Sequence, residues 1–308
     1  MRRQGIAWRI TGVATRRMGW LADPDGIEFA GEEPQARELP RHKNVREWLK
    51  AAKADVLFEA TSLNVSDGEP AIDHIRAALE AGAHAVTANK GPIVHAYEEL
   101  QSLAEARGRK FLFESTVMDG VPIFAMFRSG LPVVALKGFR GILNSTTNVI
   151  LSGMEAGLSF EQSLQKAQEI GVAETDPSHD IEGWDAAVKT AALIRVLMGV
   201  PISLTQIHRE GIGQLTGEAV REARAAGKPY KLVCQARREN ARVEASVGPQ
   251  QVPLEDPLAR VEGTSSVIRF ETDIFPDLVI TENHPGLEAT AYGMLADFVR
   301  AVEAEGPR

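Results

Sequence analysis

Cysteine, positive charge and long apolar runs are all scarce in this chain of 308 residues. Its one cysteine, Cys234, excludes disulfides within the chain and a metal site built from several cysteines. With 34 Lys and Arg against 42 Asp and Glu, the net charge of −8 argues against a nucleic-acid surface, which needs a basic face. No apolar run approaches the ~20 residues that span a bilayer, and the first residues lack the apolar core of a secretory signal. We therefore expect a soluble, cytoplasmic protein that binds neither nucleic acid nor membrane.

Short apolar segments alternate with amphipathic ones in the first half of the chain. Strands are predicted over residues 8–14, 55–60, 84–88 and 111–114, and helices over 73–81 and 97–107. Strands that alternate with helices of this length form a parallel sheet covered on both faces. The second half is mixed, with helices predicted over 159–170, 185–198 and 290–303 and several strands between 231 and 273. The sequence therefore predicts an α/β region followed by an α+β region.

Polar residues follow the predicted strands at their carboxyl ends, where parallel sheets bind ligands. The candidates for cofactor binding in these turns are Arg16, Arg17, Thr61, Ser62, Thr87, Asn89 and Lys90. Each turn alone is a weak signal, and Lys90 in TANKGP can equally be a surface lysine in a loop. An arginine after the second strand of a dinucleotide-binding unit accommodates a 2′-phosphate, so Arg16 and Arg17 favour NADP(H) over NAD(H).

One expected element of such a unit is missing from the sequence. A dinucleotide-binding domain begins with a strand and a G-x-G-x-x-G turn, and nothing before Trp8 supplies either. Gly12 and Gly19 do not have the required spacing. The parallel sheet is therefore expected to be N-terminally incomplete, and we expect a late recorded start rather than a shortened homologue.

The segment 173–189, AETDPSHDIEGWDAAVK, concentrates five carboxylates before a single lysine. A calcium loop is excluded because Ile181 and Ala187 stand where that loop needs Gly and Glu. Asp185 and Lys189 lie four residues apart, so they share one face of the predicted helix with apolar neighbours. An ion pair on a buried face is costly, which favours a functional role, although a structural ion pair is the alternative.

Four motifs together resemble the homoserine dehydrogenase family: TANKGP, ESTVMDGVPIF, GILNSTTNVIL and AETDPSHDIEGWDAAVK, in this order. The resemblance implies NAD(P)H-dependent reduction of L-aspartate 4-semialdehyde to L-homoserine, in the biosynthesis of threonine, methionine and isoleucine. It also implies a Rossmann-type nucleotide-binding domain over residues 1–117, a catalytic and dimerisation region over 118–308, and a homodimer. The alternatives are a catalytically silent homologue and a dehydrogenase for a related amino-acid-like substrate.

The resemblance also assigns roles to individual positions. Lys90, Asp185 and Lys189 match catalytic residues, and Thr146, Glu174 and Asp180 match substrate-binding ones. Glu114 and the backbone at Val117 match a site for Na⁺ or K⁺, and Gly286 lies in the loop that closes over the nicotinamide. Two departures, Ser145 in place of Gly and Val172 in place of Tyr, lie in the substrate region.

Hydride transfer to an aldehyde builds an alkoxide that must be protonated as it forms. A desolvated lysine near a second cation has a pKa lowered toward neutrality and can donate that proton. Lys90 and Lys189 are the two candidates for this proton donor, and the sequence leaves the choice open.

Overall fold

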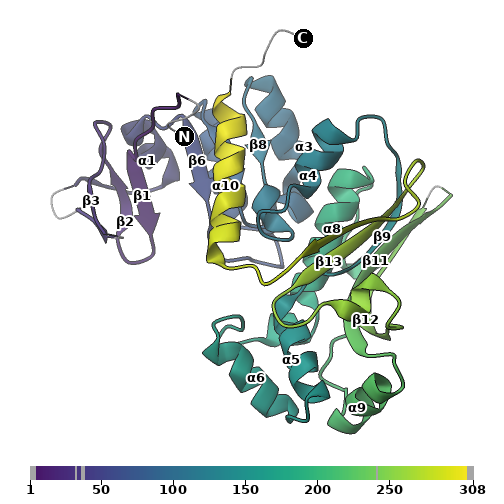
Figure 1. Ribbon diagram of the computed structural model, residues 1–308. Coiled ribbons are helices and arrows are strands. Elements are labelled where there is room, and N and C mark those ends of the chain that lie inside the picture. The colour runs from purple at the N-terminus through teal and green to yellow at the C-terminus, as the bar shows by residue number, and fades with distance from the viewer. Residues whose placement is uncertain (1–4, 32, 36–38, 241, 304–308) are drawn as a thin grey trace. The chain divides into compact units, whose positions relative to one another are not determined.

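The computed structural model describes residues 5–31, 33–35, 39–240 and 242–303, which form two compact units (Figure 1). The first unit holds the described residues up to Ser115 together with those from Tyr292 onward, and the second unit is Thr116–Ala291. Most of the last helix, α10 (Leu287–Val302), therefore belongs to the first unit. The boundary predicted after residue 117 places α10 in the second region instead. A single boundary along the sequence cannot assign a C-terminal helix to the N-terminal unit.

A three-stranded parallel sheet forms the centre of the first unit. Its strands are β6 (Val56–Glu59), β7 (His84–Thr87) and β8 (Phe111–Leu112), in that spatial order. The connecting helices are α2 (Ala71–Glu80) and α3 (Gly91–Ala106), and Pro92 lies in the first turn of α3. The predicted parallel sheet with intervening helices is thus confirmed, including three of the four strand positions.

The predicted strand over residues 8–14 differs from what the structure contains. Strand β1 (Gly12–Thr15) begins later and forms an antiparallel sheet with β2 (Gly19–Ala22) and β5 (Arg41–His42). Strands β3 (Phe29–Ala30) and β4 (Glu33–Pro34) pair separately. Helix α1 (Val45–Ala52) is capped by Asn44 and buries Trp48, whose ring Nε1–H donates to the carbonyl of Leu21 at 2.7 Å. The β-branched pattern identified an extended segment but not its partner.

The second unit is built on a six-stranded sheet in the order β10-β12-β11-β9-β13-β14. The strands are β9 (Leu136–Ile142), β10 (His208–Arg209), β11 (Tyr230–Glu239), β12 (Arg242–Gln251), β13 (Ser266–Thr272) and β14 (Leu278–Glu282). Among the described residues of this sheet, β10 and β12 pair in parallel and the other pairs are antiparallel. The predicted α+β region is therefore confirmed.

Helices complete the second unit. They are α4 (Ile123–Ala125), α5 (Ser145–Glu155), α6 (Phe160–Glu169), α7 (Ser178–Ile181), α8 (Trp184–Leu197) and α9 (Gly217–Ala225), with a π-helical turn over Met126–Gly130 and short 3₁₀ segments over Glu114–Thr116 (at the boundary of the two units), Leu204–Gln206 and Pro257–Arg260. A capping box opens α6, where Ser159 and Gln162 cap each other's backbone.

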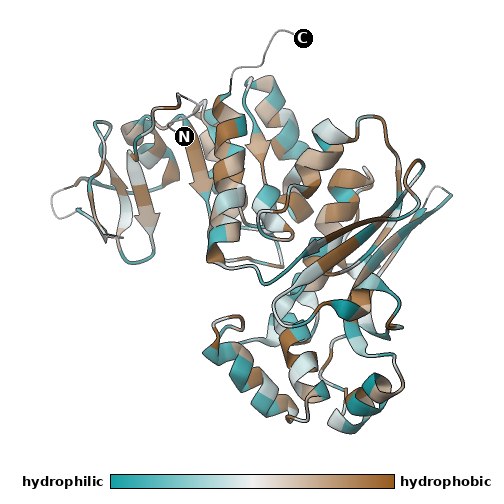
Figure 2. Ribbon diagram, in the orientation of Figure 1, coloured by the Kyte–Doolittle hydropathy of each residue, from teal (hydrophilic) through white to brown (hydrophobic). Residues whose placement is uncertain are grey.

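Apolar residues concentrate along strands of the main sheet in each unit. Figure 2 shows them along β6, β8 and β13, whereas α6 and α9 are mostly polar. Helix α8 buries eight residues and lies against β11 and β12. Cys234 on β11 is buried, and burial raises the pKa of its thiol to about 12, which agrees with a structural rather than a nucleophilic thiol. Within the described ranges, no helix is long and apolar enough to cross a membrane.

Candidate functional site

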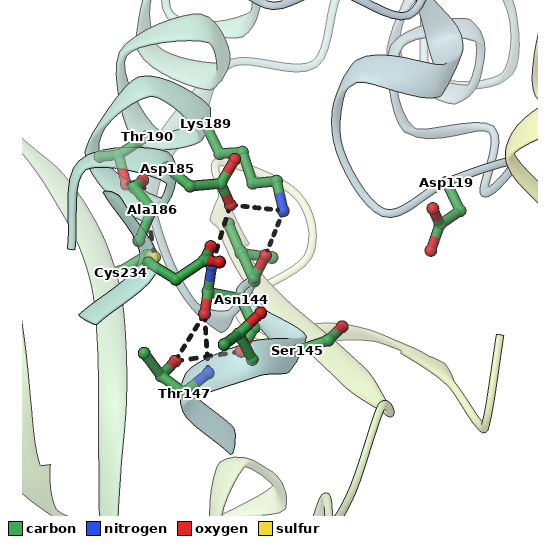
Figure 3. Close-up of polar contacts among 12 residues, drawn as sticks. Asp119, Asn144, Ser145, Thr147, Asp185, Ala186, Lys189, Thr190 and Cys234 are labelled. Carbon is green, nitrogen blue, oxygen red and sulfur yellow. Dashed lines mark hydrogen bonds and ion pairs between the residues drawn. The ribbon is translucent and has the colours of Figure 1, made fainter. Parts of the chain in front are cut away.

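A lysine and an aspartate one turn apart on α8 form the centre of a polar cluster in the second unit (Figure 3). Lys189 Nζ lies 2.9 Å from Asp185 Oδ2 and donates to the carbonyl oxygen of Leu143 at 2.6 Å. Each of the two charged side chains is only 17% exposed. The ion pair predicted from the i, i+4 spacing is therefore present, and it is largely shielded from water.

Asn144 joins this ion pair to a second carboxylate. Its side-chain Nδ2 donates to Asp180 Oδ1 at 2.6 Å and to Asp185 Oδ2 at 3.1 Å. Its Oδ1 accepts from the backbone N–H of Thr147 and so caps α5. The local sequence pattern does not identify Asn144, because nothing in it shows that one amide reaches two distant carboxylates.

The protonation states of the cluster follow from burial and from the neighbouring charges. Burial raises the pKa of Asp180, and the nearby charge of Asp185 raises it further, against the hydrogen bond from Asn144. Burial alone lowers the pKa of Lys189, but the charge of Asp185, helped by Asp119, outweighs it and the pKa is raised. The sequence predicted a lysine with a lowered pKa. For Lys189 this was wrong in direction, since its neighbours in the second unit are carboxylates rather than a second cation.

The other predicted substrate-binding residues divide into one that joins the cluster and one that lies on the surface. Thr146 is buried, donates to the carbonyl of Val172 at 3.1 Å, and offsets a small part of the rise in the pKa of Asp180. Glu174 is exposed, and its backbone carbonyl accepts from the side chain of Gln168. The role of the Glu174 carboxylate stays a prediction.

Two carboxylates that the sequence analysis did not select also act on this cluster. Asp119 accepts a hydrogen bond from Thr290 at 2.6 Å, and its charge contributes to the raised pKa of Lys189. Glu282, at the end of β14, accepts from Ser266 at 3.3 Å. Burial raises the pKa of Glu282 to about 7, with a further contribution from Asp119. Both residues lie far from segment 173–189 in sequence, so only the fold brings them near Lys189.

In the first unit, the turns after β6 and β7 meet around a buried carboxylate. Glu59, only 2% exposed, accepts from the backbone N–H of Thr61 at 2.8 Å, from the Thr61 hydroxyl, and from Thr87 Oγ1 at 2.7 Å. Asn89 donates to the carbonyls of Thr61 and Ser62 at 3.0 and 3.3 Å. The structure thus brings these predicted cofactor-binding residues to one sheet edge.

This sheet edge also has little room above its backbone. A Cβ atom on Gly91 would lie 2.9 Å from the Cα of Gly68, so these two backbone segments approach as closely as glycine allows. Lys90 directly precedes α3 and is half-buried. Hydroxyls and amides at the carboxyl ends of parallel strands fit a nucleotide ligand.

The remaining predicted positions lie elsewhere. Arg16 and Arg17 are exposed in the turn between β1 and β2. Gly286 lies in the loop between β14 and α10. The carboxylate of Glu114 is paired with Arg300 at 3.0 Å, and Val117 is buried in the other unit. In the part of the chain that the structure describes, no group of three His, Cys, Asp or Glu residues could hold a metal ion, so a monovalent-cation site stays a prediction.

Family models match both units of the chain. The NAD-binding domain of homoserine dehydrogenase matches residues 1–114, and the homoserine dehydrogenase model matches residues 122–299. The chain belongs to the homoserine dehydrogenase family. Homoserine dehydrogenases are oxidoreductases that act on a CH–OH group, which confirms the reaction class predicted from the four motifs.

Relatives of known name support the same assignment over most of the chain. A NAD(+)-dependent homoserine dehydrogenase of Pseudomonas canavaninivorans is 31% identical, over 96% of this chain and 87% of the relative. The homoserine dehydrogenase of Methanocaldococcus jannaschii is 36% identical, over 92% and 86%.

Solved homoserine dehydrogenases share the fold. A putative family member from Archaeoglobus fulgidus gives a TM-score of 0.76 at 35% identity, covering 85% of this chain and 79% of that one. A hyperthermophilic archaeal homoserine dehydrogenase mutant in complex with NADPH gives 0.78 at 26% identity, covering 94% and 86%. The Pseudomonas canavaninivorans relative is named for NAD(+), and the hyperthermophilic archaeal structure contains NADPH. The family likeness alone therefore does not select the nucleotide.

Proposed function

We propose that this chain reduces L-aspartate 4-semialdehyde to L-homoserine with NADPH or NADH, in the pathway to threonine, methionine and isoleucine. The observation that carries the proposal is the cluster of Asn144, Asp180 and the Asp185–Lys189 ion pair. An ammonium group and two shielded carboxylates offer both signs of charge to a zwitterionic amino acid. The bound nicotinamide supplies the hydride, and the residues of the chain bind the substrate and transfer the proton.

Lys189 is the proton donor in this proposal. Hydride addition to the aldehyde carbon converts the carbonyl oxygen into an alkoxide, and a lysine N–H proton passes to that oxygen to complete the alcohol. The pKa of Lys189 is raised, so the group is protonated at neutral pH and its proton passes readily to the far more basic alkoxide. Among the described residues, Asp185 and the Leu143 carbonyl use two of its three N–H bonds.

The substrate's amino acid end is assigned to the acidic side of the cluster. Asp180, with Glu174 as its candidate neighbour, binds the substrate ammonium, and Thr146 supplies a hydroxyl. Lys90 remains the second candidate for proton donor because it lies beside Asn89 at the polar sheet edge. The variants Lys189→Met and Lys90→Met separate the two assignments: the donor variant loses turnover, whereas a variant in a binding lysine mainly raises KM.

The first unit is assigned to the dinucleotide, through Thr61, Ser62, Thr87, Asn89 and Lys90, with Gly286 in the loop over the nicotinamide. We further propose NADP(H) rather than NAD(H), a homodimer in the cytoplasm, and a Na⁺ or K⁺ ion near Glu114 and Val117. The exposed arginines Arg16 and Arg17 carry the nucleotide preference. Replacing both by Ala raises KM for NADP and leaves KM for NAD unchanged; equal effects on both would reject the preference.

Substrate analogues test the role of the acidic cluster. The chain is expected to oxidise L-homoserine, and to oxidise 4-hydroxybutanoate, which lacks the ammonium, at least about 100-fold less efficiently, the loss of one charged contact. The variant Asp180→Asn reduces this discrimination because it removes the negative charge that selects the ammonium. Equal rates with both alcohols would contradict the proposed binding mode.

A further inference from the structure

The turn between α7 and α8 connects the two carboxylates of the polar cluster. Asp180 lies in α7 and Asp185 in the first turn of α8, and Asn144 donates to both of them (Figure 3). Their convergence on one amide therefore depends on the path of the chain over residues 182–184. Helix α7 has only four residues, too few to hold a fixed position by its own hydrogen bonds, so contacts from outside must hold it.

Arg209, at the end of β10, contacts this turn with its side chain. Its guanidinium stacks over the ring of Trp184, with 3.7 Å between Cζ and the ring centroid, and it donates to the carbonyl of Glu182. The indole Nε1–H of Trp184 donates in turn to Glu182 Oε2 at 3.1 Å. One arginine thus contacts residues on both sides of Gly183, in the middle of the turn.

The backbone after Arg209 makes a second set of contacts with the turn. The N–H of Ile212 donates to the carbonyl of Ile181 at 2.9 Å. A Cβ atom on Gly211 would lie 2.7 Å from the Cα of Glu182, and closer still to the carbonyl oxygen of Ile181. Only glycine allows this approach, so any larger residue at position 211 would displace the turn.

The sheet of the second unit anchors these contacts. Strand β10 pairs in parallel with β12, and the N–H of Glu210 donates to the carbonyl of the buried Val247 on β12 at 2.8 Å. We call residues 209–212 the clamp. The clamp is fixed to the sheet on one side and contacts the turn on the other, so the turn takes its position from the sheet.

We propose that Arg209 is a positioning residue for the polar cluster. With the rest of the clamp it holds the turn between α7 and α8, so that Asp180 and Asp185 both reach Asn144. The helical bonds of α8 and the ion pair with Lys189 also hold Asp185, so loss of the clamp mainly moves Asp180. The effect on substrate binding rests on the proposed function, whereas the effect on the turn does not.

Hydrogen exchange of the full chain, followed by mass spectrometry, tests whether the clamp holds the turn. Arg209→Met keeps an apolar side chain of similar reach but removes the cation and its N–H donors. The amides of residues 178–184 are expected to exchange about tenfold faster, while those of residues 190–194 in the buried part of α8 keep their rates. Arg242→Met, at an exposed arginine on β12, is the matched control and should change neither segment.

Gly211→Ala tests the same contact without removing a side chain. Its Cβ meets backbone atoms of the turn, which cannot rotate away as a flexible side chain can. The variant is therefore expected to accelerate exchange over the same residues, 178–184. Agreement between the two variants assigns the effect to the clamp rather than to the lost charge of Arg209.

Kinetic constants separate positioning from a merely structural role. In Arg209→Met, KM for L-homoserine is expected to rise about tenfold, and the preference for L-homoserine over 4-hydroxybutanoate to fall. The kcat should stay within about threefold of wild type, because Lys189 keeps its ion pair. KM for NADP should not change, since every contact of the clamp described above lies within the second unit. A partly unfolded variant would instead lose kcat at an unchanged KM.

The outcomes separate the inference from the proposed function. Unchanged exchange over residues 178–184 in both Arg209→Met and Gly211→Ala overturns the inference. Faster exchange with an unchanged KM for L-homoserine also overturns it, because Arg209 then has a structural role only. A wild type that does not oxidise L-homoserine rejects the proposed function, and the exchange rates of the two variants then decide alone whether the clamp holds the turn.

Discussion

Replacing Lys189 by Met removes the cation from the cluster while keeping a side chain of similar length. Removing one partner of a buried ion pair costs about 3–5 kcal/mol. Each partner keeps 17% exposure and Asn144 still donates to both carboxylates, so we expect a loss at the lower end, about 3 kcal/mol. If Lys189 donates the proton, kcat falls by about 10²–10⁴.

The loss of stability in Lys189→Met is expected to depend on pH. Burial and the charge of Asp185 already raise the pKa of Asp180, and loss of the lysine raises it further. A carboxyl with a raised pKa binds its proton more tightly when folded than when unfolded. The variant therefore regains stability as pH falls through the raised pKa toward the ordinary value of about 3.9.

Thermal unfolding of the wild type and the variant from about pH 4 to about pH 8, a range that covers raised carboxyl pKa values, measures this effect. The kcat of both proteins is measured at neutral pH. Lys137→Met, an exposed lysine on β9, is the matched control and should change neither quantity. A kcat within about threefold of wild type would refute the assignment of Lys189 as general acid. A Tm difference that does not vary with pH would refute the electrostatic account of the cluster.

Two further substitutions test other parts of the structure. Burial, with the charge of Asp119, raises the pKa of Glu282 to about 7. Wild-type stability should therefore fall as pH rises from the unfolded-state pKa of this carboxyl, about 4.3, through about 7. Glu282→Gln should flatten this slope of Tm against pH, and an unchanged slope would count against the argument. At Gly91, a Cβ would lie 2.9 Å from Gly68 Cα, so Gly91→Ala should cost about 1–3 kcal/mol in thermal unfolding and weaken dinucleotide binding. Gly130→Ala, where a Cβ meets only a side-chain atom at 4.0 Å, is its control, and equal losses in the two variants would contradict the steric argument.

Local sequence patterns predicted the elements that local forces determine. The helix predicted over 159–170 is present as α6 (Phe160–Glu169), and β6, β7 and β8 lie within one residue or two of their predicted positions. Helix α3 begins at Gly91 rather than Tyr97, because a kink at Ala96 separates a first turn whose apolar residues do not follow the later periodicity. Pairing of β1 with β2 was missed because β-branched composition does not specify a partner.

The candidate site was predicted only in part, because some of its contacts are local in the sequence and others are not. The spacing of Asp185 and Lys189 is local, and their ion pair could be read from it. Asn144, Asp119 and Glu282 come from other elements, and no periodicity links them to α8. Burial lowers the pKa of Lys189, but the charge of Asp185, four residues away on α8, outweighs it with help from Asp119, so the sequence argument, which invoked a second cation, gave the wrong sign.

The most direct test of the central claim is to incubate the chain with L-aspartate 4-semialdehyde and NADPH, and to measure loss of the reduced nicotinamide together with formation of L-homoserine by mass spectrometry. The account predicts one L-homoserine for each NADPH consumed, and near-complete loss of both signals in Lys189→Met. NADPH consumption without L-homoserine, or L-homoserine formed at the wild-type rate by the variant, would contradict it.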